Sequence, residues 1–159
     1  MFKKALIAST ALFVATSSFA ATMVKDIDVS ADITAIENTK AAAYWADVST
    51  DLEAAIAARL VDQVGETGSE IKIDVNELAL TNSFQSSLGL EDAVLVGQVN
   101  IVNDSDNTKF DAYELTISAK AASAFGPGGL PLEGAFTDTP EYYAALIEAF
   151  ADGVVTRLK

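Results

Sequence analysis

Residues 94–118 read VLVGQVNIVNDSDNTKFDAYELTIS, and the rest of the expected fold is built around this stretch. Its two ends, 94–102 and 110–118, are rich in the β-branched and aromatic residues typical of strands. The segment between them, 103–109, consists of Asn, Asp, Ser, Thr and Lys. Short polar side chains of this kind favour turns because they bond to nearby backbone groups. The stretch therefore predicts a β-hairpin with a long polar tip.

Two segments upstream alternate between apolar and polar residues, the pattern of a strand with one buried face. The first covers residues 27–34. The second covers residues 71–76 and is expected to continue through Leu78 and Leu80. Residues 82–90 have the composition of a loop.

Residues 39–64 instead repeat apolar residues every three or four positions, which predicts an amphipathic helix. The apolar stripe consists of Trp45, Val48, Leu52, Ile56 and Leu60. Ser49 or Thr50 is a candidate N-cap inside this range, so the pattern fits one helix or two. Gly65 and Gly68 are expected to end the helical segment.

A second helix is expected at the C-terminal end. Thr139 and Pro140 form a favourable N-cap and first-turn pair. The apolar stripe that follows consists of Tyr143, Leu146, Ile147, Phe150, Val154 and Leu158. Residues 124–139, rich in Gly and Pro, are predicted to form a long loop before this helix.

The predicted order of elements is β-α-β-β-β-α. Each helix carries an apolar stripe that must be buried against another surface. The sequence therefore predicts an α+β, two-layer sandwich, in which two helices cover one face of a four-stranded, mostly antiparallel sheet. The remaining length, residues 21–159, fits a single domain of this kind.

Residues 1–20 have the features of a secretory signal peptide. Lys3 and Lys4 precede the apolar run 5–15, and small residues stand before the expected cleavage site after Ala20. The run is shorter than the ~20 apolar residues of a membrane span. The mature chain is expected to begin at Ala21, without stable membrane insertion, in the periplasm or outside the cell.

The composition excludes several classes of function. Removal of residues 1–20, which hold two lysines and no acid, takes the net charge from −13 to −15. A charge of this sign repels nucleic-acid phosphates, so nucleic-acid binding is not expected. The chain contains no cysteine and no histidine. Nucleophile pairs with histidine, histidine-ligated metals and a cysteine-linked lipid anchor are therefore excluded, and no cofactor is expected.

One motif match is best explained by chance. Residues 69–72 read S-x-x-K and residues 105–107 read S-D-N, two of the three motifs of serine β-lactamases and penicillin-binding proteins. The third motif, K-T-G, is missing. The serine of that family opens a helix, whereas Ser69 opens an alternating segment. We assign no catalytic residue from this match.

Neighbouring acids leave two other chemistries open. The pairs closest in sequence are Glu91 with Asp92, Asp104 with Asp106, and Glu148 with Asp152. Two carboxylates that met in a cleft would suit a hydrolase. Asp104 and Asp106 are also candidate ligands of a calcium ion, which prefers oxygen ligands. Because Asn and Asp bond to their own backbone in turns, a plain hairpin turn is the favoured interpretation of residues 103–107.

Aromatic and glycine residues supply the binding candidates. In each of the pairs Tyr44-Trp45 and Tyr142-Tyr143, one member is expected on the buried stripe, which leaves Tyr44 and Tyr142 as candidates for stacking on a ligand. The long loop adds three candidates at a recognition edge. These are Gly126, Gly128 and Gly129.

The order of elements resembles the small domains of ABC-transport auxiliary and related envelope lipoproteins. The likeness rests on the alternating strand, the segment with Trp45, the DLEAAI helix at 51–56, the hairpin and the terminal helix, and it covers residues 25–159. It implies an accessory role in envelope assembly or transport, with no catalytic residues. The missing lipid-anchor cysteine departs from that family's usual anchored state.

The sequence thus favours an exported, non-catalytic binding or accessory protein that recognises an envelope protein or a small ligand. A carboxylate-based hydrolase and a calcium-responsive binding protein are the alternatives. The sequence does not indicate an oligomeric state.

Overall fold

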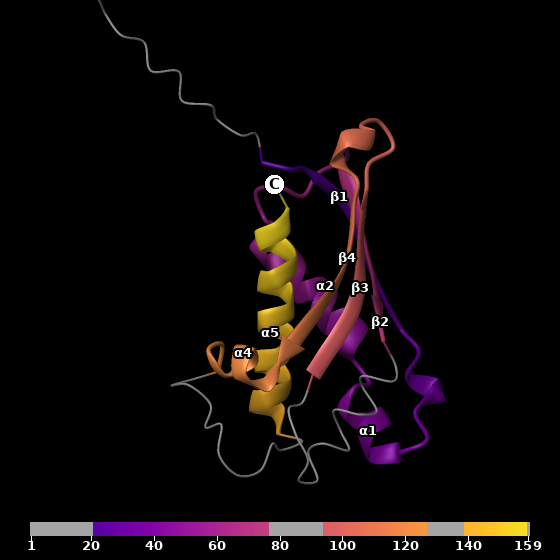
Figure 1. The fold of residues 1–159 in the computed structure, drawn as a ribbon, viewed down its shortest axis with the longest axis vertical. Coiled ribbons are helices and arrows are strands. Elements are labelled where there is room, and N and C mark those ends of the chain that lie inside the picture. Colours follow the sequence, from indigo (N-terminus) through magenta and orange to yellow (C-terminus); the bar gives the residue numbers. More distant parts are fainter. Residues whose placement is uncertain (1–20, 77–93, 127–138, 159) are drawn as a thin grey trace, which may run out of the picture.

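The computed structural model describes residues 21–76, 94–126 and 139–158 (Figure 1). In chain order, the elements are β1 (Val24–Ala31), the 3-10 turn η1 (Ile33–Ala35), α1 (Thr39–Tyr44), α2 (Val48–Arg59), β2 (Ser69–Val75), β3 (Val94–Val102), the 3-10 turn η2 (Asn107–Lys109), β4 (Asp111–Ser118), α4 (Ala119–Ser123) and α5 (Pro140–Arg157).

The four strands form one mixed sheet in the order β1-β2-β3-β4. β1 and β2 are parallel because the chain returns through α1 and α2 before β2 begins. The other two pairings, β2 with β3 and β3 with β4, are antiparallel. The predicted mostly antiparallel sheet and the α+β class are confirmed.

The two long helices cover one face of this sheet (Figure 1). α2 packs against β1 and α5, and α5 packs against β3 and β4. We call the opposite face, which α2 and α5 leave uncovered, the open face. The two-layer arrangement agrees with the prediction.

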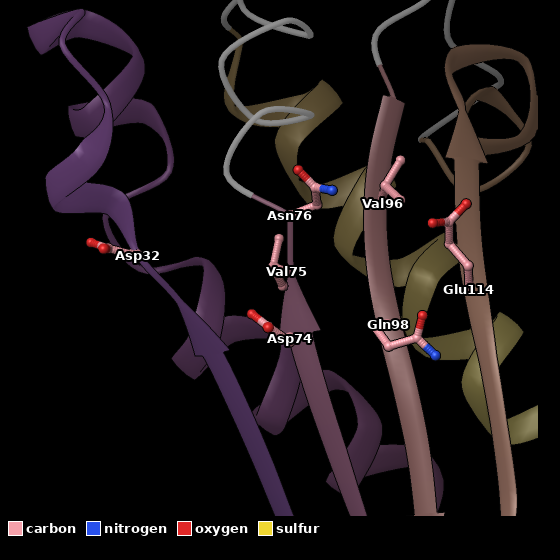
Figure 2. Close-up of a pocket in the computed structure, with 7 residues that line it drawn as sticks. All are labelled: Asp32, Asp74, Val75, Asn76, Val96, Gln98 and Glu114. Atoms are coloured by element: carbon pink, nitrogen blue, oxygen red, sulfur yellow. The ribbon is translucent and has the colours of Figure 1, made fainter.

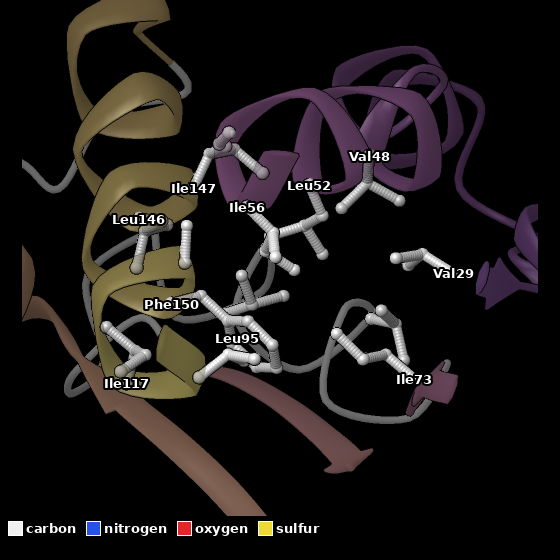
Figure 3. Packing of buried hydrophobic residues seen from close by; sticks show 14 of the residues in the cluster. Val29, Val48, Leu52, Ile56, Ile73, Leu95, Ile117, Leu146, Ile147 and Phe150 are labelled. Carbon is white, nitrogen blue, oxygen red and sulfur yellow. The ribbon is translucent and has the colours of Figure 1, made fainter. Parts of the chain in front are cut away.

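The core lies between the two helices and the inner face of the sheet (Figure 3). Its largest fully buried side chains are Trp45, Phe150, Leu52, Ile56, Leu60, Ile71, Ile73, Leu95, Leu146, Val24 and Val48. All five residues of the stripe expected in 39–64 belong to this set. Full burial of one such aliphatic side chain stabilises the fold by roughly 1.5–3 kcal/mol.

The segment expected as one or two helices forms two, and the break differs from the predicted one. The N-cap of α2 is Asp47, whereas Ser49 and Thr50 lie inside the helix. The reason is that a turn already forms before them: Val48 N donates to Trp45 O (3.1 Å) and Asp51 N donates to Asp47 O (2.9 Å). Neither candidate cap, Ser49 or Thr50, begins a helix.

Glycine does not end α2. The helix ends at Arg59, and Val64 N and Gln63 N both donate to Leu60 O (3.0 and 2.7 Å), which turns the chain before Gly65 is reached. Gly68 has a different role. Its φ is +143°, and a Cβ there would lie 2.2 Å from Met23 O, so only glycine fits beside the start of β1.

The first strand is displaced toward the N-terminus. It ends at Ala31, and Ile33 lies in η1 instead of continuing the strand. The Asp32 side chain caps this turn by accepting from Thr34 N (3.0 Å), which competes with extended pairing.

The hairpin and the closing helix form where they were predicted. β3 and β4 flank the polar tip, and Thr139 caps α5 by accepting from Tyr142 N, with Pro140 in the first turn. α4 was not expected; it begins because Ser118 Oγ accepts from Ala121 N (3.2 Å). The expected continuation of β2 through Leu78 and Leu80, the loop at 82–90 and residues 127–138 of the long loop lie outside the described residues.

No helix among the described residues is long and apolar enough to cross a membrane.

Candidate functional site

A hollow of about 530 Å³ opens on the open face, near the C-terminal ends of β1 and β2 (Figure 2). We call it the sheet-face hollow. The described residues that line it are Asp32, Asp74, Val75, Asn76, Val96, Gln98 and Glu114. Five of these seven side chains are polar, which suits a ligand held by hydrogen bonds.

Sheet register brings the polar side chains together. Asp74 is the partner of Gln98, and Gln98 is the partner of Glu114, so the three residues form one row across β2, β3 and β4. Side chains of directly opposite residues point to the same face. The next row is fixed by Asn76 N, which donates to Val96 O (2.9 Å). The hairpin β3–β4 and the more distant strand β2 thus contribute to one surface.

The sheet-face hollow is acidic. It contains three carboxylates and two carboxamides, and no Lys or Arg lines it among the described residues. Asp32 is held in place because Thr34 Oγ1 and Thr34 N donate to its Oδ1 (2.5 and 3.0 Å), and these bonds lower the pKa of its carboxyl. The arrangement offers mainly acceptor oxygens, which match hydroxyl or ammonium donors on a ligand.

The residues suggested for calcium have protein partners at the hairpin tip. Asp104 Oδ2 accepts from Lys25 Nζ (2.7 Å), and Asp106 Oδ1 accepts from Thr108 N (3.0 Å). Asn103 Oδ1 accepts from Ser105 N and Asp106 N. Within the described residues, no group of three or more acids is arranged to hold a metal ion. The tip has the contacts of a polar turn.

Neither acid pair within the described residues lines the sheet-face hollow. Glu148 forms an ion pair with Arg59 (2.5 Å) on the helix layer, and Asp152 is exposed. Glu91 and Asp92 lie outside the described residues.

The S-x-x-K match is divided between the two faces of β2. Ser69 is fully buried, and its Oγ accepts from Asn103 Nδ2 (3.1 Å). Lys72 is exposed and its Nζ pairs with Glu70 (3.1 Å). Residues three apart on a strand point to opposite faces, so the serine and the lysine do not face one another.

Of the two aromatic candidates, Tyr44 belongs to a cluster of three rings. The rings of Tyr44, Trp45 and Tyr143 lie 4.8–5.7 Å apart between centroids, and Tyr44 is half-buried. Tyr143 OH donates to Asp51 Oδ2 (2.6 Å). Burial and this bond to a carboxylate raise the pKa of the Tyr143 phenol. The cluster joins α1 and α2 to α5 as packing.

Tyr142 is placed differently from the prediction. It is only 6% exposed, and Tyr143, expected on the buried stripe, is the half-buried member of the pair. The inner side of α5 is wide enough to include Tyr142 together with Ala145 and Ala149, three and seven positions later. Tyr142 therefore does not lie at an exposed helix flank. Of the glycine candidates, Gly126 is half-buried, and Gly128 and Gly129 lie outside the described residues.

Sequence reasoning missed the sheet-face hollow. Alternation identifies Asp74 as a solvent-facing residue of its strand, but only the register places it beside Gln98 and Glu114. No protein-family model matches the chain, and neither curated proteins nor solved structures give a match.

Proposed function

We propose that the chain is an exported, non-catalytic binding protein of the periplasm or the extracellular space, and that it holds a small polar ligand in the sheet-face hollow. The signal-peptide features of residues 1–20 support export. The observation that carries the binding proposal is the acceptor-rich lining of a hollow on the open face. An accessory role in envelope transport or assembly, as the likeness to ABC-transport auxiliary domains implies, is compatible with such a site.

The hydrogen-bond acceptors that line the sheet-face hollow indicate which class of ligand it binds. Carboxylate and carboxamide oxygens at Asp74, Gln98 and Glu114 accept hydrogen bonds from several directions. A ligand with hydroxyl or ammonium groups satisfies them, whereas an anion meets like charge. The absence of histidine and cysteine from the whole chain removes the commonest general bases and nucleophiles, which supports a binding role over a catalytic one.

Native mass spectrometry of the mature protein, purified gently from its own cells, tests this proposal. We expect the chain to begin at Ala21 and to carry an extra mass on the order of a few hundred daltons, which a hollow of this volume accommodates. A bare chain, or a second protein chain in place of the small ligand, contradicts the proposed ligand class.

Two double variants test whether the ligand binds in the sheet-face hollow. The double substitution Asp74→Ala with Glu114→Ala removes two carboxylates from the sheet-face hollow and is expected to abolish the extra mass. Asp26→Ala with Asp28→Ala is the matched control, because these acids are exposed on β1 but do not line the hollow. Equal loss in both variants would place the ligand elsewhere.

A further inference from the structure

The two edges of the sheet differ in how their backbone groups are satisfied. At the β1 edge, Val24 N donates to Gln63 O (2.8 Å) and Gly65 N donates to Val24 O (3.0 Å). Further along, Val29 N donates to Glu53 Oε1 of α2 (3.1 Å). A register shift between Val24 and Asp26 adds an irregularity to this edge. Such devices prevent another strand from pairing there.

Apart from the Ala112 N–H, which donates to the Asp111 side chain, the β4 edge has no such closure in the described residues. β4 pairs with β3 in unbroken register from Asp111 to Ser118. In antiparallel pairs, successive residues turn their backbone groups alternately to one neighbour and to the other. Asn76 N donates to Val96 O, so Val96 and the alternate residues after it turn their backbone toward β2.

The same alternation identifies the β4 residues whose backbone groups point away from β3. The partners of Val96, Gln98 and Asn100 on β4 are Thr116, Glu114 and Ala112. Their backbone N–H and C=O groups therefore point away from the sheet. The hydrogen bond of Ala112 N supports this direction, because Ala112 N donates to the Asp111 side chain (2.9 Å) and not to β3.

The residues that carry these outward backbone groups are exposed. Ala112, Glu114 and Thr116 are all exposed, and no described residue bonds to the outward backbone of Glu114 or Thr116. The strand contains neither Lys nor Pro, the residues that commonly guard a sheet edge. β4 is therefore a regular strand with one unpaired side.

We infer that β4 pairs antiparallel with β4 of a second copy of this chain, about a two-fold axis that passes through the sheet at Leu115. Antiparallel self-pairing uses the same edge on both copies, so it closes after two subunits and joins the two sheets into one of eight strands. Among the described strands, the joined sheet then ends at the two β1 edges, which the bonds given above already protect.

The charge of Glu114 favours one register of the β4–β4 pairing over the other. A two-fold axis at Glu114 would place two glutamates directly opposite each other, which is destabilising. An axis at Leu115 places Glu114 opposite Thr116 on the open face. On the helix side, the same register places Leu115 opposite Leu115 and Tyr113 opposite Ile117, and apolar cross-strand pairs of this type are favourable.

Sedimentation equilibrium of the mature protein tests the inference. We expect a reversible monomer–dimer equilibrium that shifts toward dimer as salt is added, because salt screens the repulsion between two strongly acidic chains. A monomer at every protein and salt concentration overturns the inference, whatever the fate of the bound ligand.

A matched set of variants tests the edge and the register. In the proposed register residue 116 faces Glu114 of the other copy, so Thr116→Lys is expected to tighten the dimer and Thr116→Glu to weaken it, each by roughly three- to tenfold. Thr50→Lys and Thr50→Glu make the same charge changes at an exposed site on α2, the helix that packs against β1 and α5. If the dissociation constant responds equally at residues 50 and 116, β4 is not the interface.

Discussion

The two faces of β2 differ in burial and charge, and under the proposed function this difference separates stability from recognition. On the inner face, Ile71, Ile73 and Val75 are at most 2% exposed and pack in the core. On the open face, the alternate residues Lys72 and Asp74 are exposed. Because hydrophobic burial dominates the free energy of folding, we expect stability to depend on the inner face, with the open face free to bind.

The open face is itself divided. At one end, Lys25 pairs with Glu70 (3.0 Å) and Asp104 (2.7 Å), and Lys72 pairs with Glu70 (3.1 Å). At the other end, the sheet-face hollow gathers carboxylates, and Asp74 and Glu114 have no ion pair within the described residues. The acidic end is therefore the part of this face that a cationic or hydroxyl-rich ligand would complement.

The largest expected loss of stability comes from truncating a buried side chain of the core. Phe150→Ala removes a fully buried ring and is expected to lower the free energy of unfolding by roughly 3–5 kcal/mol. Phe110→Ala removes the same ring from a site that is 60% exposed, where a change within about 0.5 kcal/mol is expected. Urea unfolding of both variants measures the difference, and equal losses would contradict the assignment of the core.

The next prediction concerns the close packing of Gly97 on β3 against Phe150 on α5. A Cβ at Gly97 would lie 2.8 Å from Phe150 Cζ and 3.3 Å from Ile73 Cγ2, so Gly97→Ala is expected to cost roughly 1–3 kcal/mol. In a Phe150→Leu background the closest of these contacts is gone, and Gly97→Ala is expected to cost less. Additive losses in this double-mutant cycle would show that the ring does not limit residue 97.

The inner face was largely predictable from sequence, because buried positions recur at regular spacings as apolar residues. The stripe from Trp45 to Leu60 is buried as expected even though the helix breaks within it. The break itself depends on the bonds at Asp47 and Val48, which are local and have no strong residue signature. Cap residues with a clear signal, such as Thr139 before Pro140, gave the correct helix start.

The open face was not predictable to the same degree. Polar residues alternate along each strand, but their meeting depends on the pairing register, which long-range contacts set. Asp74 and Glu114 are 40 positions apart in sequence and come together only through Gln98 between them. The aromatic candidates, by contrast, were chosen by residue type. In the structure Tyr142 is 6% exposed, and the half-buried Tyr44 packs its ring against Trp45.

A third prediction compares two tyrosines on the covered side. Tyr143 OH donates to Asp51, so Tyr143→Phe is expected to cost about 1 kcal/mol. Tyr113 OH is buried without a partner in the described structure, so Tyr113→Phe is expected to leave stability unchanged or to raise it. Thermal or urea unfolding at neutral pH measures both, and a larger loss for Tyr113→Phe would contradict the assigned contacts.

Alkaline pH extends this test. Burial raises the pKa of Tyr113 from 10.0 to about 12. A raised pKa favours the neutral phenol in the folded state, so its contribution to stability is complete below pH 10 and is lost as the pH rises from 10 toward 12. Wild-type stability is expected to fall through this window more steeply than that of Tyr113→Phe.

The smallest expected effect lies on the open face, at Glu70. Hydrogen bonds from Lys25 and Lys72 hold the pKa of Glu70 below its ordinary value of 4.5. A lowered pKa favours the carboxylate in the folded state, so this contribution is present above pH 4.5 and is lost as the pH falls below it. Glu70→Gln is therefore expected to lower the thermal midpoint slightly at pH 7, and its curve should converge with the wild type in acid.

Asp74→Asn is the control for this effect, because it removes a carboxylate from the same strand and face where no cation pairs with it in the described residues. Its thermal midpoint at pH 7 is expected to equal or exceed that of the wild type, since one negative charge leaves an acidic surface. A loss at Asp74 as large as that at Glu70 would mean that the acidic end of the open face contributes to folding, and the separation of stability from recognition would then fail there.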